Sequence, residues 1–197
     1  ILEEESAGVK VLQLADRRIV KLFRRKRLIS SQIWAPHARR FSLNAQTLKE
    51  RGIPTITVES YFEVPEMERQ VVVYFRLEGT TLRDWMVGKD EVERTRMMVK
   101  LGSFIAQLHE AGVLFRSLHF GNVLVMEDGE LALIDIVDMG FRWFGSLSIG
   151  QRVRNFHHMD RYDDDRVALA SDHEGGFIRH YLKASSLTES QKQRIEG

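Results

Sequence analysis

Two stretches decide how the fold is interpreted: residues 113–122 read VLFRSLHFGN, and residues 133–136 read LIDI. Between them, Asp128-Gly129 joins short apolar segments at 123–126 and 131–134, which is a strong hairpin signal. A polar loop that ends in Asn122 is therefore followed by a hairpin that leads to Asp135. Amide and carboxylate oxygens are hard ligands that suit Mg²⁺. The pattern indicates a magnesium site of the kind that holds nucleotide phosphates.

The first part of the chain has the pattern of an antiparallel sheet with one helix. Apolar residues predict strands at residues 9–14, 18–23, 56–64 and 70–76. Apolar residues at helical spacing from Trp34 to Leu48 predict a helix that ends at Gly52. The pattern breaks at residues 77–81. We therefore expect a small lobe at residues 1–76 and a second lobe at 77–197.

The second lobe is predicted to be mainly helical. An apolar stripe from Met97 to Leu108 predicts a helix, which begins near Asp90 and Glu93 and ends at Gly112. Residues after about 150 also have a helical and irregular pattern, and Asp163–Asp165 are interpreted as a solvated turn or a helix start. The expected fold class is α+β, with an antiparallel sheet and one helix followed by a helical lobe that carries the hairpin.

At these motifs the sequence resembles the protein-kinase-like fold in a minimal, two-lobed form. More narrowly, it is similar to the bacterial lipopolysaccharide core kinases: the heptose and Kdo kinases and their relatives, some labelled toluene-tolerance proteins. That family writes its catalytic loop as His-Arg-Asp-x-x-x-x-Asn, and here Arg116 and Asn122 match it. The metal-binding aspartate of the next motif falls on Asp135, thirteen residues after Asn122.

The resemblance also implies residues that hold the nucleotide. The lysine that grips the phosphates falls on Lys21, and the hinge falls near Phe75–Gly79, where Glu78 is a candidate cofactor-binding residue. The implied cofactors are ATP and Mg²⁺, with Asn122 and Asp135 as metal ligands. Taken alone, Lys21 is more readily interpreted as a surface lysine and Asn122 as a turn residue, whereas an unpaired aspartate inside an apolar run is costly.

Several positions depart from the family pattern. Ser117 stands where the family has its catalytic aspartate, and serine cannot act as a base at neutral pH without a partner. His119 is a candidate base, and it is equally interpreted as a packed loop histidine. Val137 replaces the glycine after the metal-binding aspartate, and Asp138 offers a second carboxylate as a metal ligand.

The acid that pairs with the lysine in the family is also missing. No Asp or Glu occurs from Arg17 to Lys49, and Asn44 flanks the apolar stripe at about the expected place. We expect Asn44 to be a cofactor-site residue that hydrogen-bonds Lys21, although a neutral partner orients a lysine less strongly than a carboxylate does.

The net charge of +1 hides a basic segment. Residues 17–51 contain eleven Lys or Arg and one acid, and Arg24-Arg25-Lys26-Arg27 are contiguous. This segment is interpreted either as a face for an anionic partner or as a solvated surface. It lacks an evident stacking platform, so nucleic acid is not the expected partner.

The expected function is that of a lipopolysaccharide-core-kinase-like phosphotransferase, which uses ATP and Mg²⁺ on an anionic sugar or glycolipid with weakened catalysis. The alternative is a pseudokinase that binds nucleotide or a partner without phosphoryl transfer. The chain contains no cysteine and no apolar run near 18 residues, so we expect a cytoplasmic protein, with peripheral contact to the inner membrane through Arg24–Arg27. It begins with Ile1 rather than methionine, which suggests a missing leading segment.

Overall fold

The computed structural model describes residues 3–5, 8–24 and 37–196, and these form two compact units. The first contains residues up to 78 together with 135–137, and the second contains residues 79–134 and 138–197. The segment 135–137 belongs to the first unit, whereas the sequence pattern placed every residue after 76 in the second lobe.

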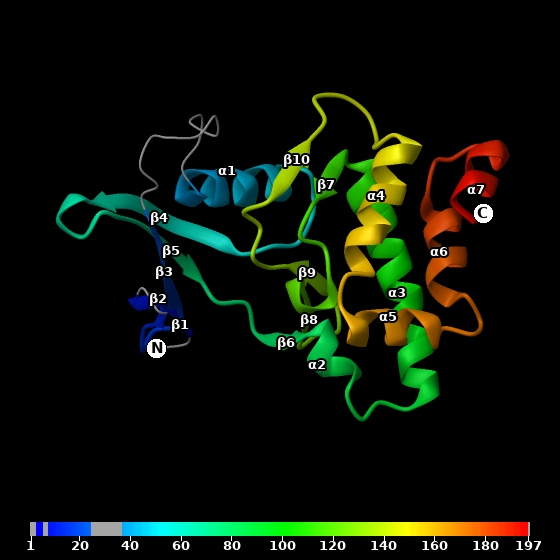
Figure 1. Ribbon diagram of the computed structural model, residues 1–197, viewed down its shortest axis with the longest axis horizontal. Helices are drawn as coiled ribbons and strands as arrows, with labels where there is room; N and C mark the ends of the chain where they lie inside the picture. The colour runs from blue at the N-terminus through cyan, green and yellow to red at the C-terminus, as the bar shows by residue number, and fades with distance from the viewer. Residues whose placement is uncertain (1–2, 6–7, 25–36, 197) are drawn as a thin grey trace. The chain divides into compact units, whose positions relative to one another are not determined.

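The first unit is a five-stranded antiparallel sheet with one helix (Figure 1). The strand order is β1-β2-β3-β5-β4, with β1 at Glu3–Glu5, β2 at Gly8–Gln13, β3 at Arg18–Arg24, β5 at Arg69–Phe75 and β4 at Thr57–Val64. The short helix η1, Pro65–Met67, joins β4 to β5. The four strands predicted here are present, with ends that differ by at most one residue.

The helix α1, His37–Glu50, covers the sheet with an apolar stripe. Ala38, Phe41, Ala45 and Leu48 are buried, as their helical spacing predicted. The Phe41 ring packs between Phe23 and Tyr74, with centroids 5.9 and 5.4 Å away. Trp34 and Arg25–Arg27 lie outside the described residues, so the predicted helix start and most of the basic run have no structural counterpart here.

The second unit is built around the 20-residue helix α3, Glu91–Glu110. The Asp90 side chain accepts the N–H of Glu93 at its start, and Gly112 adopts a left-handed conformation just after its end, both as predicted. The helix α6, Gly176–Ala184, packs against α3 at Gly102, where an added Cβ would lie 2.1 Å from the carbonyl oxygen of Phe177. Only glycine permits this close approach.

Short strands and further helices complete this unit (Figure 1). They are β6 (Gly79–Thr81), α2 (Leu82–Met86), β7 (Val113–Phe115), η2 (Phe120–Asn122), β8 (Val123–Met126), β9 (Leu131–Leu133), β10 (Met139–Phe141), α4 (Ile149–Met159), α5 (Asp163–Ala170) and α7 (Glu189–Glu196). The predicted hairpin is β8–β9, to which β6 adds a third strand. Residues 113–115 were expected in a polar loop but form a buried strand, because they pair with β10.

Candidate nucleotide and catalytic site

An ion pair joins Lys21 to Asp135 in the first unit. The Lys21 Nζ lies 2.5 Å from Oδ1 of Asp135, although 114 residues separate them in the chain. The lysine side chain is only 10% exposed, and its ammonium lies 5.6 and 5.4 Å from the ring centroids of Phe23 and Phe41. Two aromatic faces and one carboxylate therefore hold the cation at the middle of β3. Lys21 is not a freely exposed surface lysine.

Asp135 presents its carboxylate from an unusual backbone conformation. Its φ is +50°, which is in the left-handed region, and its side chain is 54% exposed. A residue with a Cβ loses about 1–2 kcal/mol in this region. Strain of this kind persists where the surrounding contacts impose it, and it is concentrated at functional sites.

Asn44 supplies part of that constraint. It is buried, and its amide nitrogen donates to the carbonyl oxygens of Ile136 and Val137 at 2.7 and 3.1 Å. The amide nitrogen thus bonds the backbone that follows Asp135, while Lys21 pairs with Asp135 itself. A hydrogen bond from the Lys21 ammonium would use the Asn44 amide oxygen, so this expected contact stays a prediction. Asn44 positions the segment that carries the carboxylate.

Glu78, the predicted hinge residue, belongs to the first unit. Its Oε1 lies 3.7 Å from Nη1 of Arg17, and the two side chains are 39% and 76% exposed. A long, exposed ion pair of this kind contributes little to stability. The carboxylate is thus accessible to a bound molecule.

Arg116 follows the buried strand β7 in the second unit. Its Nη1 lies 3.4 Å from Oδ1 of Asp138 and 3.4 Å from the carbonyl oxygen of Met139, while its N–H donates to the Asp138 carbonyl at 2.9 Å. Asp138 is therefore engaged with Arg116. The role of its carboxylate as a metal ligand stays a prediction.

The loop from Ser117 to Asn122 is closed by its last residue. The Asn122 amide nitrogen donates to the Ser117 carbonyl at 2.8 Å, and its own N–H donates to the carbonyl of His119 at 2.9 Å. The carbonyl of Asn122 accepts the N–H of Ile134, the residue before Asp135. Asn122 is buried, and these bonds make it more than a turn residue.

His119 stabilises the same loop. Its Nδ1 accepts the N–H of Gly121 at 3.1 Å, and its ring packs edge-on against Tyr162 at 4.7 Å between centroids. A neutral imidazole with Nδ1 as acceptor carries its proton on Nε2. His119 therefore lacks a free lone pair for a substrate proton in this arrangement. A Cβ at Gly121 would lie 3.0 Å from this ring, which explains the glycine.

The residue that the sequence pattern missed is Asp165. It was expected in a solvated turn or helix start, and α5 does begin at Asp163, but the Asp165 side chain is fully buried. Its carboxylate accepts two hydrogen bonds from Arg83, at 2.8 and 2.9 Å, and one from the N–H of Phe120 at 2.8 Å. Asp165 thus fixes the backbone of the loop from Ser117 to Asn122 at Phe120. Asp163, Asp164 and Asp165 are consecutive and identical, so the local sequence does not indicate which of the three is buried.

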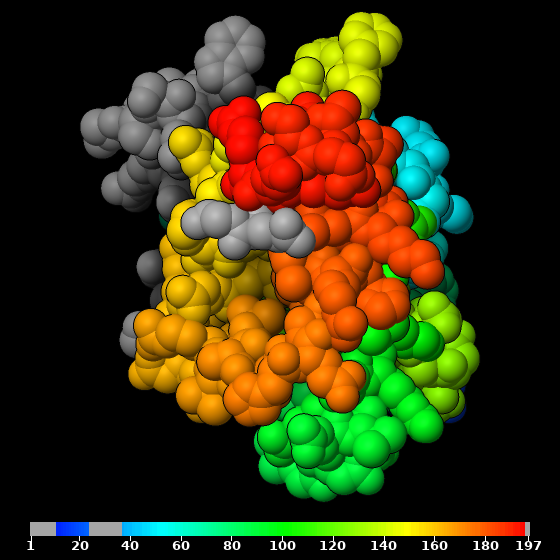
Figure 2. All heavy atoms as spheres, turned by 90° about the vertical axis from the view of Figure 1, so that its right-hand side faces the viewer, coloured from blue at the N-terminus to red at the C-terminus, as the bar shows by residue number. Residues whose placement is uncertain are grey.

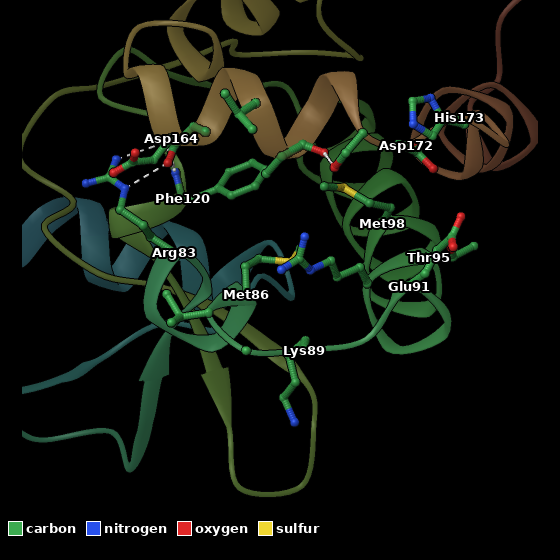
Figure 3. Close-up of a pocket in the computed structure, with 17 residues that line it drawn as sticks. Arg83, Met86, Lys89, Glu91, Thr95, Met98, Phe120, Asp164, Asp172 and His173 are labelled. Atoms are coloured by element: carbon green, nitrogen blue, oxygen red, sulfur yellow. Dashed lines mark hydrogen bonds and ion pairs between the residues drawn. The ribbon is translucent and has the colours of Figure 1, made fainter.

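A pocket of about 820 Å³ lies beside this ion pair, between α2, α3 and α5 (Figure 3). Phe120 and Met98 point into it, and Arg83 lies at one end. None of the predicted site residues lines this pocket. Phe120 connects this pocket to the loop from Ser117 to Asn122.

A buried polar network supports the loop from the other side. Nδ1 of His109 lies 2.9 Å from the Tyr181 hydroxyl, and Nε2 lies 3.2 Å from Oδ1 of Asn155. Asn155 also exchanges hydrogen bonds with the backbone of Phe115, the residue before Arg116. Burial lowers the pKa of His109 to about 3, so the ring is neutral at physiological pH.

Each predicted metal ligand, taken separately, has the oxygen chemistry that suits Mg²⁺. Asp135 offers a carboxylate oxygen and Asn122 an amide oxygen, and hard oxygen donors are the ligands this ion prefers. Within the described ranges, no group of three or more His, Asp or Glu side chains could hold a metal ion. The described residues therefore contain no cluster of histidines of the kind that binds softer metals.

Comparison with known proteins decides the family. Residues 12–194 match the model of the lipopolysaccharide kinase (Kdo/WaaP) family. The chain belongs to this family. The predicted resemblance to the lipopolysaccharide core kinases is thereby confirmed. Membership of this family supports a kinase-like function. None of the curated proteins matches the sequence significantly.

A solved structure agrees with the kinase-like fold of this Kdo/WaaP family member. The bifunctional kinase-methyltransferase WbdD is similar, with a TM-score of 0.51 and 15% identity over 91% of this chain and 45% of that one. The chain thus spans about half the length of WbdD. The kinase PK-1 of Cydia pomonella granulovirus has a TM-score of 0.46 and 10% identity, over 91% and 66% of the two chains. The likeness to WbdD confirms the predicted α+β, kinase-like fold.

Proposed function

We propose that the chain is an ATP- and Mg²⁺-dependent phosphotransferase that acts on a sugar hydroxyl of a lipopolysaccharide core or a related anionic glycolipid. The observation that carries this proposal is the Lys21–Asp135 pair, 2.5 Å long and sheltered by two phenylalanine rings. A cation and a carboxylate held together in this way are suited to nucleotide phosphates and their metal ion.

In this proposal, Lys21 binds the phosphates and Glu78 belongs to the nucleotide site. Asp135 and Asn122 would hold Mg²⁺, with Asp138 as a further candidate. The ion supplies charge stabilisation for the phosphates when it is bound. The left-handed backbone of Asp135 and the two Asn44 hydrogen bonds support the assignment, because they hold this carboxylate in place before any ligand binds.

Catalysis is proposed to be weakened at Ser117. Serine lacks the basicity of the aspartate that the family places there, and general-base help contributes about 10²–10⁴ in rate. His119 is a poor replacement because its Nδ1 accepts the N–H of Gly121. Arg116, paired with Asp138, positions this loop. Some turnover is still expected, since phosphoryl transfer depends mainly on positioning and charge stabilisation.

A pseudokinase is the second candidate function, and Ser117 is the observation that favours it. Such a protein would keep Lys21, Asn122 and Asp135 for nucleotide binding and would have lost transfer. The phosphotransferase and the nucleotide-binding form of the pseudokinase both predict ATP binding, so ATP binding separates these two from functions that use no nucleotide.

The proposed location is the cytoplasm, with peripheral contact to the inner membrane. Among the described residues, no helix has the length and apolar character needed to cross a bilayer. The proposed contact is the basic run Arg24–Arg27, of which residues 25–27 lie outside the described part. Near an anionic membrane each basic residue contributes about 1 kcal/mol, so added salt should weaken this contact.

The test is a calorimetric titration with ATP, with and without Mg²⁺, followed by a transfer assay on purified lipopolysaccharide core. Wild type should bind ATP more tightly with Mg²⁺. Asp135→Asn should lose the Mg²⁺-dependent part, and Lys21→Met should weaken ATP binding in both conditions. The matched control is Lys49→Met, an exposed lysine on α1, which should bind like wild type.

The outcomes separate the candidates. Binding with transfer identifies the phosphotransferase, and binding without transfer to the core or any tested sugar acceptor identifies the pseudokinase. A folded wild type that binds no ATP in the presence of Mg²⁺ would exclude the phosphotransferase and the nucleotide-binding pseudokinase, and would leave only a pseudokinase that binds a partner.

A further inference from the structure

Two adjacent aromatic side chains of the second unit stand in solvent. They lie in the loop that joins β10 to α4, where Trp143 is 92% exposed and Phe144 is 86% exposed. Figure 2 shows the yellow-green atoms of this part of the chain projecting beyond those of α4 and α7. A single exposed apolar residue needs no explanation, but two large neighbouring rings on one projection indicate a surface that binds something.

Both ends of this loop are fixed to the same end of α3. The N–H of Arg142 donates to the carbonyl of Gly112 at 2.9 Å, and the N–H of Leu147 donates to the carbonyl of His109 at 2.9 Å. The Leu147 side chain is buried, and its carbonyl accepts Nε of the buried Arg152 at 2.9 Å. The aromatic pair is therefore presented by a rigid base.

The loop is also closed internally. Nε of Arg142 lies 3.4 Å from the carbonyl oxygen of Phe144, and Nη1 lies 3.4 Å from Oε1 of Gln151. Gly145 follows with a φ of +68°, the left-handed conformation that permits the tight turn. Ser148 and Gln151 then form a capping box at the start of α4. The two rings are therefore exposed to solvent, although hydrogen bonds hold the backbone on both sides of them.

The surrounding segment has one sign of charge. No Asp or Glu occurs from Met139 to Met159, which contains Arg142, Arg152 and Arg154. Arg152 is buried and paired with Glu110, whereas Arg142 and Arg154 are exposed. Tryptophan is favoured at membrane–water interfaces, and exposed cations are attracted to anionic lipids. Aromatic rings beside cations thus match the surface of an anionic bilayer.

We propose that the loop of residues 142–147 is an interfacial membrane anchor, which inserts Trp143 and Phe144 among the head groups of an anionic bilayer while Arg142 and Arg154 contact the lipid charges. This anchor is separate from the basic run Arg24–Arg27, which would bind by charge alone. It does not depend on the proposed phosphotransferase function, because no step of nucleotide binding or transfer enters the argument.

The first experiment uses the fluorescence of Trp143 to report on the surroundings of this loop. The sequence has three tryptophans, so Trp34→Phe and Trp85→Phe together leave Trp143 as the reporter. The full chain is mixed with vesicles of phosphatidylglycerol and phosphatidylcholine, or of phosphatidylcholine alone. With the mixed vesicles, emission should shift to the blue and be quenched by brominated acyl chains. A charge-only contact through residues 24–27 would leave Trp143 in water, with unchanged emission.

A second measurement uses substitution. Trp143→Ser with Phe144→Ser should weaken binding to the mixed vesicles by about tenfold or more, because the inserted apolar area is lost. The matched control is Val87→Ser with Val92→Ser, which removes two side chains of the same unit that are 77% and 58% exposed. The control should bind like wild type, and circular dichroism should show both variants folded.

Three results would overturn the anchor: unchanged Trp143 emission on mixed vesicles, equal vesicle binding by the two double variants, or equal binding to vesicles without phosphatidylglycerol. A blue shift that follows protein concentration in the absence of lipid would assign the loop to contact between copies of the chain instead, and would also overturn it. ATP binding by the same samples is measured in parallel, so failure of the anchor is distinguishable from failure of the proposed function.

Discussion

Asp165 binds Arg83 through both of its carboxylate oxygens: Oδ1 lies 2.8 Å from Nε, and Oδ2 lies 2.9 Å from Nη2. Oδ2 also accepts the N–H of Phe120, in the loop from Ser117 to Asn122. The Asp165 side chain is fully buried, whereas that of Arg83 is 30% exposed. One carboxylate therefore links α5, which carries Asp165, and α2, which carries Arg83, to the segment that contains Ser117 and Asn122.

Removal of this carboxylate should destabilise the second unit strongly. Asp165→Ala leaves the Phe120 N–H and part of the Arg83 guanidinium without an acceptor, and breaking a buried pair costs about 3–5 kcal/mol. We expect the free energy of unfolding, measured by urea denaturation, to fall by about 3 kcal/mol because Arg83 remains partly solvated. Asp163→Ala, two residues earlier, removes an exposed carboxylate paired with Arg166 and should change stability by less than about 0.5 kcal/mol. Equal losses in the two variants would contradict the structural role of Asp165.

The backbone after Asp135 should depend on Asn44. Asn44→Ala removes both donors from the Ile136 and Val137 carbonyls, and an unsatisfied buried acceptor costs about 1–3 kcal/mol. We expect lower stability together with weaker Mg²⁺-dependent ATP binding, measured by thermal denaturation and calorimetry. Gln46→Ala, an exposed position on the same helix, is the control and should leave ATP binding unchanged. If Asn44→Ala lowers stability but preserves ATP affinity, Asn44 has no part in positioning Asp135.

Buried His109 should make stability fall as the pH falls. Its pKa is about 3 in the folded protein against an ordinary value of 6.5. Between these values the unfolded chain binds a proton that the folded protein does not. The free energy of unfolding therefore decreases on acidification, by up to about 1.4 kcal/mol per pH unit from this residue.

The measurement is urea denaturation from about pH 6.5 to 5, above the range where most carboxyl groups titrate. His109→Gln should be less stable than wild type at pH 7 and should show a shallower decrease over this range. His157→Gln replaces an exposed histidine on α4 and should keep the wild-type slope. Parallel slopes for wild type and His109→Gln would refute this assignment.

Catalysis, if present, should improve when the missing carboxylate is restored. Ser117→Asp places a base next to Arg116 in the loop closed by Asn122, and general-base help is worth about 10²–10⁴ in rate. We expect faster transfer or ATP hydrolysis with nearly unchanged ATP affinity, measured by phosphate release and calorimetry. Ser117→Asn is the control of similar size and should not accelerate the reaction.

Wild-type turnover at about 1–100 s⁻¹, the ordinary range for kinases, would show that Ser117 is no defect. His119→Ala then identifies the base: loss of activity with ATP binding intact would point to His119, and retained activity would point to Asp138. The Nδ1 bond to Gly121 leads us to expect retained activity.

Local signals in the sequence were sufficient for most of the elements. Asp128-Gly129 marked the β8–β9 hairpin, and Asp90 and Gly112 marked the two ends of α3, because turns and caps are determined by residues a few positions apart. The strand β7 was missed because its partner β10 begins 24 residues further along the chain. A three-residue apolar stretch has no periodicity of its own, so only pairing defines it as a strand.

For the candidate site, the sequence by itself determined the order and spacing of Lys21, Arg116, Asn122 and Asp135, and the absence of an aspartate at Ser117. The tertiary structure decided which groups meet. Lys21 reaches Asp135 across 114 residues, Asn44 reaches Ile136 across 92, and Asp165 reaches Phe120 across 45. Burial and pairing of a polar side chain depend on what the folded chain brings to it, and neighbouring residues in the sequence carry no record of that partner.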